Sequence, residues 1–154
     1  MEHASVDDIE MDGPAGSLGL SEPLGLTDFA INHYSLAPGE EFSGGLHTHL
    51  DQEEAFYIIS GTATFEFADE PLGETETVEV GPDEAIRFAP GEYQTGQNEG
   101  DEPVEALAFG APEGSEDVRV PGPCGNCGEE ALQLRFEDGE LVAFCPECGA
   151  GAGE

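Results

Sequence analysis

The chain has 154 residues, of which 35 are Asp or Glu and three are basic, for a formal net charge of −32. Such a surface repels itself in dilute buffer but is tolerable in concentrated salt, so the composition predicts a halophilic protein from a high-salt cytoplasm. The basic residues are three scattered arginines, which cannot form the cationic cluster that nucleic acid or an anionic membrane would require.

Residues 1–27 predict an N-terminal lead-in rich in Gly, Pro and Asp. Residues 1–12 are acidic and contain no long apolar run, so we expect no secretory signal, and no stretch approaches membrane-spanning length. A cytoplasmic location then favours metal binding over disulfides for the four cysteines.

The segment 28–110 has the pattern of an all-β barrel or sandwich. Short apolar runs alternate with Gly and Pro turns, and no span shows sustained helical periodicity. The predicted strands span 29–36, 42–49, 54–60, 62–68, 75–80, 84–89, 93–98 and 103–109. Residues 111–120 predict a linker rich in Pro, Gly and acidic residues, and a second unit spans 121–150.

The second unit contains two CxxC pairs, Cys124/Cys127 and Cys145/Cys148, with 17 residues between them that predict a β-hairpin. This pattern resembles a zinc ribbon, because two such turns can direct four thiolates at one tetrahedral zinc. Four thiolates leave no open position, so the zinc is expected to be structural. A redox dithiol is the alternative. The hairpin carries only Arg135 as a cation, so we expect contact with a protein rather than nucleic acid.

The most informative stretch of the barrel is His47-Thr-His49-Leu-Asp-Gln-Glu-Glu54. Two histidines that are two residues apart on a strand point to one face. Glu54 follows after a bend and opens the next strand. Two imidazoles and one carboxylate converging in a barrel predict a divalent metal site with open positions. The alternative is that both histidines are hydrogen-bonded polar residues at the barrel mouth.

These residues resemble the first motif of the cupin superfamily, which has the form G…HxH, then Glu after three or four residues, then Gly after six. His47, His49, Glu54 and Gly61 match that spacing, whereas Glu53 matches only the shorter His–Glu spacing. The resemblance covers roughly residues 28–109 and implies a double-stranded β-helix, or jelly-roll, barrel followed by the small zinc-ribbon hairpin.

The second cupin motif is matched in part. Gly91 and Asn98 stand at their expected places, Gln94 occupies the position where the family usually has its third histidine, and Ala89 replaces the usual proline. The resemblance implies a barrel metal, Fe, Mn, Ni or Zn, held by His47, His49, Glu54 and Gln94.

The resemblance also implies a metal-dependent oxygenase or isomerase acting on a small molecule. The alternative is a non-enzymatic module that binds a small molecule or metal and uses the ribbon for protein contacts. If Glu54 points inward, Tyr57 and Ile59 point outward, and a strand that is apolar on both faces must be covered by a second barrel or by the N-terminal lead-in. Cupins commonly dimerise through such a surface, so the resemblance implies a homodimer. His33 is expected to be a hydrogen-bonded core or surface histidine, with a role in the pocket as the alternative. Arg87 is expected to pair with a carboxylate, with binding of an anionic substrate as the alternative.

Overall fold

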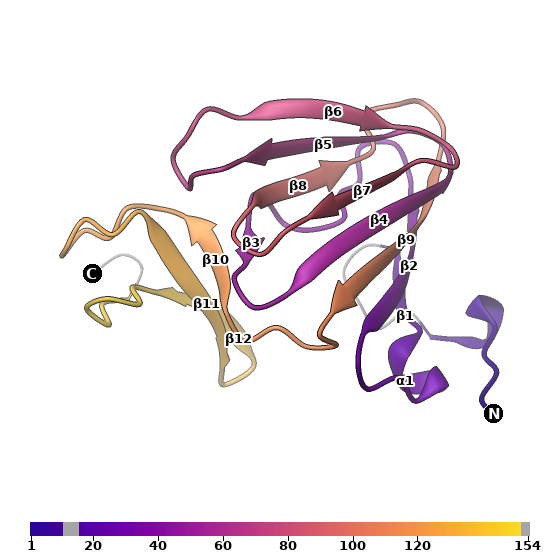
Figure 1. Ribbon diagram of the computed structural model, residues 1–154, viewed down its shortest axis with the longest axis horizontal. Helices are drawn as coiled ribbons and strands as arrows, with labels where there is room; N and C mark the ends of the chain where they lie inside the picture. The colour runs from indigo at the N-terminus through magenta and orange to yellow at the C-terminus, as the bar shows by residue number, and fades with distance from the viewer. Residues whose placement is uncertain (11–15, 152–154) are drawn as a thin grey trace.

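The computed structural model describes residues 1–10 and 16–151, and its regular structure is almost entirely β (Figure 1). Two short helices lie in the N-terminal segment, η1 (Val6–Asp8) and α1 (Ser21–Leu24). The strands are β1 (Ser17–Gly19), β2 (Ala30–Leu36), β3 (Thr48–His49), β4 (Glu53–Ser60), β5 (Ala63–Ala68), β6 (Glu76–Val80), β7 (Ala85–Phe88), β8 (Tyr93–Gln97), β9 (Val104–Ala111), β10 (Val118–Pro121), β11 (Ala131–Glu137) and β12 (Glu140–Phe144). No helix in the described residues has the length and apolar character needed to cross a membrane.

Two antiparallel sheets form the barrel. One has the strand order β1-β2-β9-β4-β7 and the other the order β6-β5-β8, and they face each other in the jelly-roll arrangement that the sequence predicted (Figure 1). A third sheet, β12-β11-β10-β3, carries the C-terminal hairpin against one end of the barrel. The short strand β3 therefore belongs to the barrel by sequence and to the hairpin by hydrogen bonding.

The core lies between the two barrel sheets and combines aromatic with small side chains. Across β4 and β9, Phe56 is opposite Ala108 and Ile58 is opposite Ala106. The alanines leave room for a group of rings whose contacting pairs have centroids 5.0–6.4 Å apart. This group comprises Phe42, Phe56, Phe65 and Phe88, all of which are buried. Large aromatic residues facing small ones thus pack the space between the sheets.

Most predicted strands are observed within one or two residues of their expected ends, but the prediction for 42–49 is largely wrong. Only Thr48–His49 forms a strand there. Glu41 and His47 make isolated bridges to Gln97 and Gln94 of β8. The adjacent glycines at 44 and 45 interrupt the strand, and Gly45 has a φ of 145°, which side-chain-bearing residues rarely adopt.

The N-terminal and linker segments contain more regular structure than the sequence indicated. Residues 17–19 of the lead-in form β1, which pairs with β2. Residues 118–121 cross the predicted boundary between linker and ribbon and form β10, which pairs with both β3 and β11. The alternating Val118 and Val120 supply the strand preference that the flanking prolines and acids obscured.

Gly61, the glycine of the first motif, is required by both its conformation and its surroundings. Its φ is +75°, and a Cβ atom there would lie 2.3 Å from the Pro103 carbonyl oxygen. Gly39 has a similar φ of +87°, but a Cβ there would meet nothing within 4 Å. A side chain at Gly39 would therefore cause conformational strain alone, whereas a side chain at Gly61 would cause both strain and a steric clash.

We expect Gly39→Ala to lower the free energy of unfolding by about 1–2 kcal/mol, the cost of a left-handed conformation. Gly61→Ala should lower the free energy of unfolding by about 1–3 kcal/mol more than Gly39→Ala does, because the new methyl group would clash with backbone atoms, which cannot move aside as a side chain can. Urea unfolding in high salt measures both. Equal losses for the two variants would contradict the steric argument.

Candidate metal centre

The side chains of His47, His49 and Glu54 meet at one end of the barrel. Each offers one ligand atom, and these atoms all lie within 4.8 Å of one another. The His49 Nε2 atom is 3.5 Å from Glu54 Oε2, and the two imidazole rings lie edge to face with centroids 5.2 Å apart. Ligands bound at about 2.1 Å to one ion are about 3–4 Å apart, so small side-chain movements would bring all three onto a shared ion.

Backbone pairing on both sides of the HxH segment produces this convergence. His47 exchanges hydrogen bonds with Gln94 of β8, with N···O distances of 3.1 and 2.8 Å. His49 is paired with Val118 of β10. Thr48, between the histidines, points to the other face and is only 1% exposed. The extended backbone therefore holds both imidazoles on the side from which Glu54 enters.

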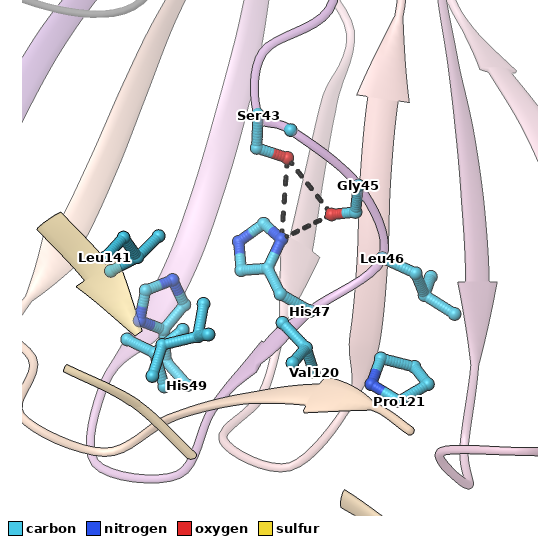
Figure 2. A pocket seen from close by; sticks show the side chains of 11 residues that line it. Ser43, Gly45, Leu46, His47, His49, Val120, Pro121 and Leu141 are labelled. Atoms are coloured by element: carbon cyan, nitrogen blue, oxygen red, sulfur yellow. Dashed lines mark hydrogen bonds between the residues drawn. The ribbon is translucent and has the colours of Figure 1, made fainter. Parts of the chain in front are cut away.

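Each imidazole is oriented through its Nδ1 atom. His47 Nδ1 lies 2.9 Å from the Gly45 carbonyl oxygen, an atom that can only accept (Figure 2). His49 Nδ1 lies 2.9 Å from Ser115 Oγ, and that hydroxyl donates its own proton to Asp51 Oδ1 at 2.5 Å. Both Nδ1 atoms must therefore carry a proton, so in the neutral ring each Nε2 keeps a lone pair available to a metal.

Gln94 lies beside the same atoms and is only 3% exposed. Its Nε2 atom donates to Glu54 Oε2 at 2.8 Å and lies 3.4 Å from His47 Nε2. In this orientation the amide holds the carboxylate. A half-turn of the amide would present its oxygen, the atom that can bind a cation.

The environment favours neutral imidazole. Burial lowers the pKa of His49, and the neighbouring His47 lowers it too, against opposing effects of Glu54 and Asp51. Neutral imidazole is the metal-binding form. The donor set of two imidazoles and one carboxylate, with each ring oriented through its Nδ1 atom, therefore fits a divalent metal with open positions.

A pocket of about 600 Å³ opens beside the two histidines. Leu46, His47 and His49 line its barrel side (Figure 2). Its other side comes from the C-terminal unit: Val118, Val120, Pro121, Leu134 and Leu141. The pocket therefore lies between the barrel and the hairpin, and it is largely apolar apart from the imidazoles.

The four cysteines also come together, with their Sγ atoms within 4.8 Å of one another. Cys124 Sγ is 3.6 Å from Cys148 Sγ, and Cys127 Sγ is 3.4 Å from Cys145 Sγ. A disulfide would require about 2.05 Å, whereas thiolates bound to tetrahedral zinc at about 2.3 Å are about 3.8 Å apart. The cluster has the spacing of a closed four-thiolate zinc site.

Hydrogen bonds in this cluster adjust the thiol pKa values. Backbone N–H groups of Cys127 and Asn126 lower the pKa of Cys124. A hydrogen bond from the Asn126 side chain is the main reason that the pKa of Cys148 falls to about 6. The pKa of Cys127 rises to about 12, because the neighbouring thiols outweigh a hydrogen bond from the Glu129 N–H. Zinc would displace the protons that remain.

Three other residues named from the sequence, Arg87, His33 and Asn98, make contacts outside the metal centre. Arg87 Nε donates to Glu53 Oε2 at 2.6 Å, as expected for a surface ion pair. His33 Nε2 lies 3.2 Å from Glu105 Oε2, which agrees with a hydrogen-bonded histidine outside the pocket. Asn98 is buried and donates to two backbone carbonyl oxygens, so its role is structural.

Sequence reasoning missed the residues behind and opposite the histidines. Ser115, which orients His49, lies 66 residues further along the chain in the predicted linker. Asp51 follows the HxH motif closely, but nothing in its position indicated a contact with that linker. The sequence placed Leu134 and Leu141 on the strands of the hairpin but gave no sign that they line a pocket.

Comparison with known proteins identifies the barrel. A family model described as a cupin domain matches residues 32–110. A search of curated proteins found no significant match.

Several solved structures share the fold. A sugar phosphate isomerase of the cupin superfamily from Silicibacter pomeroyi has a TM-score of 0.69 at 17% identity, over 96% of this chain and 95% of that one. A Bacillus halodurans protein has a TM-score of 0.53 at 20% identity, over 57% of this chain and 65% of that one. Oxalate decarboxylase from Bacillus subtilis, studied for its Mn(II) centres, has a TM-score of 0.58 at 19% identity, over 73% of this chain and 29% of that one.

The chain thus spans just under two thirds of the Bacillus halodurans protein and a smaller part of the decarboxylase. All three identities are low, so these matches show a shared fold alone. The match to the Silicibacter pomeroyi structure extends well beyond residues 32–110, since it takes in 96% of this chain.

We expect Ser115→Ala to weaken metal binding at the barrel by about 10–100-fold, the usual effect of removing a group that orients a histidine ligand. Ser35→Ala is the matched control, because the Ser35 hydroxyl also donates to a carboxylate at 2.5 Å, that of Glu105, which pairs with His33 and not with a metal-centre histidine. Competition with a metallochromic chelator measures both affinities. Unchanged affinity in Ser115→Ala would show that the hydrogen bond does not orient the ring.

Proposed function

The chain belongs to the cupin domain family, and on that premise we propose that its barrel binds a divalent metal and acts on a small molecule as a metal-dependent oxygenase or isomerase. The observation that carries the proposal is the convergence of one ligand atom each from His47, His49 and Glu54 within 4.8 Å, beside an apolar pocket. His49 Nε2 lies 3.5 Å from Glu54 Oε2, and His47 Nε2 lies 3.4 Å from the Gln94 amide nitrogen that donates to the same oxygen, which supports an ion held among these groups.

The proposed chemistry divides between the metal and the chain. A bound Fe, Mn, Ni or Zn ion would act as a Lewis acid on an oxygen of the ligand. His47, His49 and Glu54 would hold the ion, and Gln94 would either complete the ligand set or hold Glu54 by its N–H. The cupin relatives described as a sugar phosphate isomerase and as a decarboxylase with Mn(II) centres support metal-dependent chemistry on small molecules.

For the C-terminal unit we propose a structural zinc held by the four cysteines. A unit of about 30 residues cannot build a sufficient core alone, and zinc binding can contribute about 10 kcal/mol or more of folding free energy. The net charge of −32 supports the proposal that the protein works in a high-salt cytoplasm.

The second candidate is a non-enzymatic module that binds a small molecule or a metal in the barrel, with the ribbon available for protein contacts. One observation favours it. Among the described residues that line the pocket, the two histidines are the only ones with an acid–base side chain. If both hold a metal, no separate acid or base remains there. A panel of small oxygenated substrates separates the candidates, because a module would bind without turnover.

Metal analysis of protein purified anaerobically in high salt should find two metal equivalents per chain. We expect the double variant His47→Ala/His49→Ala to lose one equivalent and Cys124→Ser to lose the other. His33→Ala, which alters a histidine paired with Glu105, should retain both. If the double histidine variant keeps full metal content with its circular dichroism unchanged, the barrel is not the metal site.

We also propose that the outer face of β4 forms a homodimer contact. Tyr57 and Ile59 point outward as expected and are 37% and 43% exposed, while Phe56 and Ile58 are buried. Light scattering in high salt should give the mass of a dimer, and Ile59→Glu should shift it to that of a monomer. Leu72→Glu, at a 54% exposed position on the β5–β6 connection, is the control. A monomeric wild-type protein would contradict the proposal.

A further inference from the structure

The C-terminal hairpin supplies the outer wall of the pocket beside the histidines. Val118 and Val120 come from β10, Leu134 from β11 and Leu141 from β12. Figure 2 shows Leu141 and Val120 across from the His49 and His47 rings. Leu141 is 55% exposed, a large apolar surface left open to water beside a candidate metal centre.

Several contacts hold this wall in place. Within the β3–β10 pair, Thr48 is opposite Arg119, and the Leu50 N–H donates to the Asp117 carbonyl at 2.9 Å. Asp51 Oδ2 accepts from the Glu116 N–H at 2.7 Å. These hydrogen bonds fix the linker and β10 to the barrel on the side that carries His49.

A small apolar cluster also joins the C-terminal hairpin to the barrel. Tyr93 and Ala68 of the barrel are buried together with Ala131 of β11, and Leu46 packs against them. Because the hairpin is tied to the barrel by both the backbone and this cluster, the pocket is a built feature of the fold.

The pocket lacks any cationic side chain in the described part of the protein. Arg119 is engaged by Asp117, Arg87 pairs with Glu53 at 2.6 Å, and Arg135 pairs with Glu137 at 2.6 Å. None of the three lines the pocket, and the chain has no lysine. Concentrated salt would screen the long-range repulsion between the acidic surface and an anionic ligand. What disfavours a phosphate group is therefore the absence of a cationic side chain in the pocket to bind it.

We propose that the ribbon hairpin forms the apolar half of the ligand site and that the ligand carries no phosphate. This inference rests on the metal centre proposed above. The ligand is a small molecule with an oxygen donor at one end, which reaches the metal beside His47 and His49, and an apolar body that lies against Val120, Leu134 and Leu141. The hairpin, and the zinc that folds it, therefore determine which molecules the barrel accepts.

Straight-chain hydroxamic acids test this directly, because each carries an oxygen-donor head and an apolar tail of adjustable length. Calorimetric titrations in high salt would use protein with zinc in the ribbon and Ni²⁺ in the barrel. From acetohydroxamic to hexanohydroxamic acid we expect the Kd to fall by about two- to fourfold per added methylene, as apolar burial predicts. Glucose 6-phosphate and inorganic phosphate should not displace hexanohydroxamic acid.

Two variants assign the effect to the hairpin. Leu141→Ala and Leu134→Ala should flatten the dependence on tail length while leaving the Kd for acetohydroxamic acid and the zinc content unchanged. Leu141 is exposed, so its substitution should not disturb folding. Leu72→Ala removes a similarly exposed leucine away from the pocket and should retain the full dependence.

The outcomes distinguish this inference from the proposed metal centre. If acetohydroxamic acid binds no better to Ni²⁺-loaded wild-type protein than to His47→Ala/His49→Ala, the metal centre fails and the ligand assignment fails with it. If acetohydroxamic acid binds through the metal but the Kd is independent of tail length, only the apolar site is overturned. Displacement of hexanohydroxamic acid by glucose 6-phosphate at comparable concentration would also overturn it.

Discussion

The antiparallel pairing of β3 with β10 is the contact on which the candidate metal centre and its pocket depend. It joins Thr48 and His49 to Arg119 and Val118, so a two-residue strand both carries a candidate metal ligand and anchors the C-terminal hairpin. The same contact brings Ser115 behind the His49 ring. Position of the ring, orientation of the ring and the outer wall of the pocket thus all follow from one short stretch of backbone hydrogen bonds.

Charge is distributed so that the acidic surface and the barrel interior remain separate. Among residues 1–10 and 16–151, none of the buried polar residues is acidic. Glu54 is half-buried, and it is compensated by the Gln94 N–H at 2.8 Å and by His49 at 3.5 Å. Burial of an uncompensated carboxylate would be costly, so the position of Glu54 is explained by the imidazoles and the amide around it.

The two clusters of candidate metal ligands differ in whether a further ligand could reach the metal. The four thiols enclose one point with Sγ separations of 3.4 and 3.6 Å between the closest pairs, which leaves no room for a further ligand. The imidazoles and Glu54 converge within 4.8 Å, and both imidazoles also line the pocket. Under our proposal, the closed site stabilises the hairpin and the open site binds the ligand, so the first shapes the surroundings of the second.

The sequence by itself determined the local features: strand positions from short apolar runs bounded by Gly and Pro turns, the ligand candidates His47, His49 and Glu54 from their spacing, and the cysteine pairs from theirs. These follow from the geometry of a strand or a tight turn, which a few neighbouring residues specify. Only the tertiary structure decided that Ser115 orients His49 and that Leu134 and Leu141 line the pocket beside the imidazoles. Those facts depend on pairing between segments about 70 residues apart, and local sequence patterns do not encode which distant backbone a short strand will join.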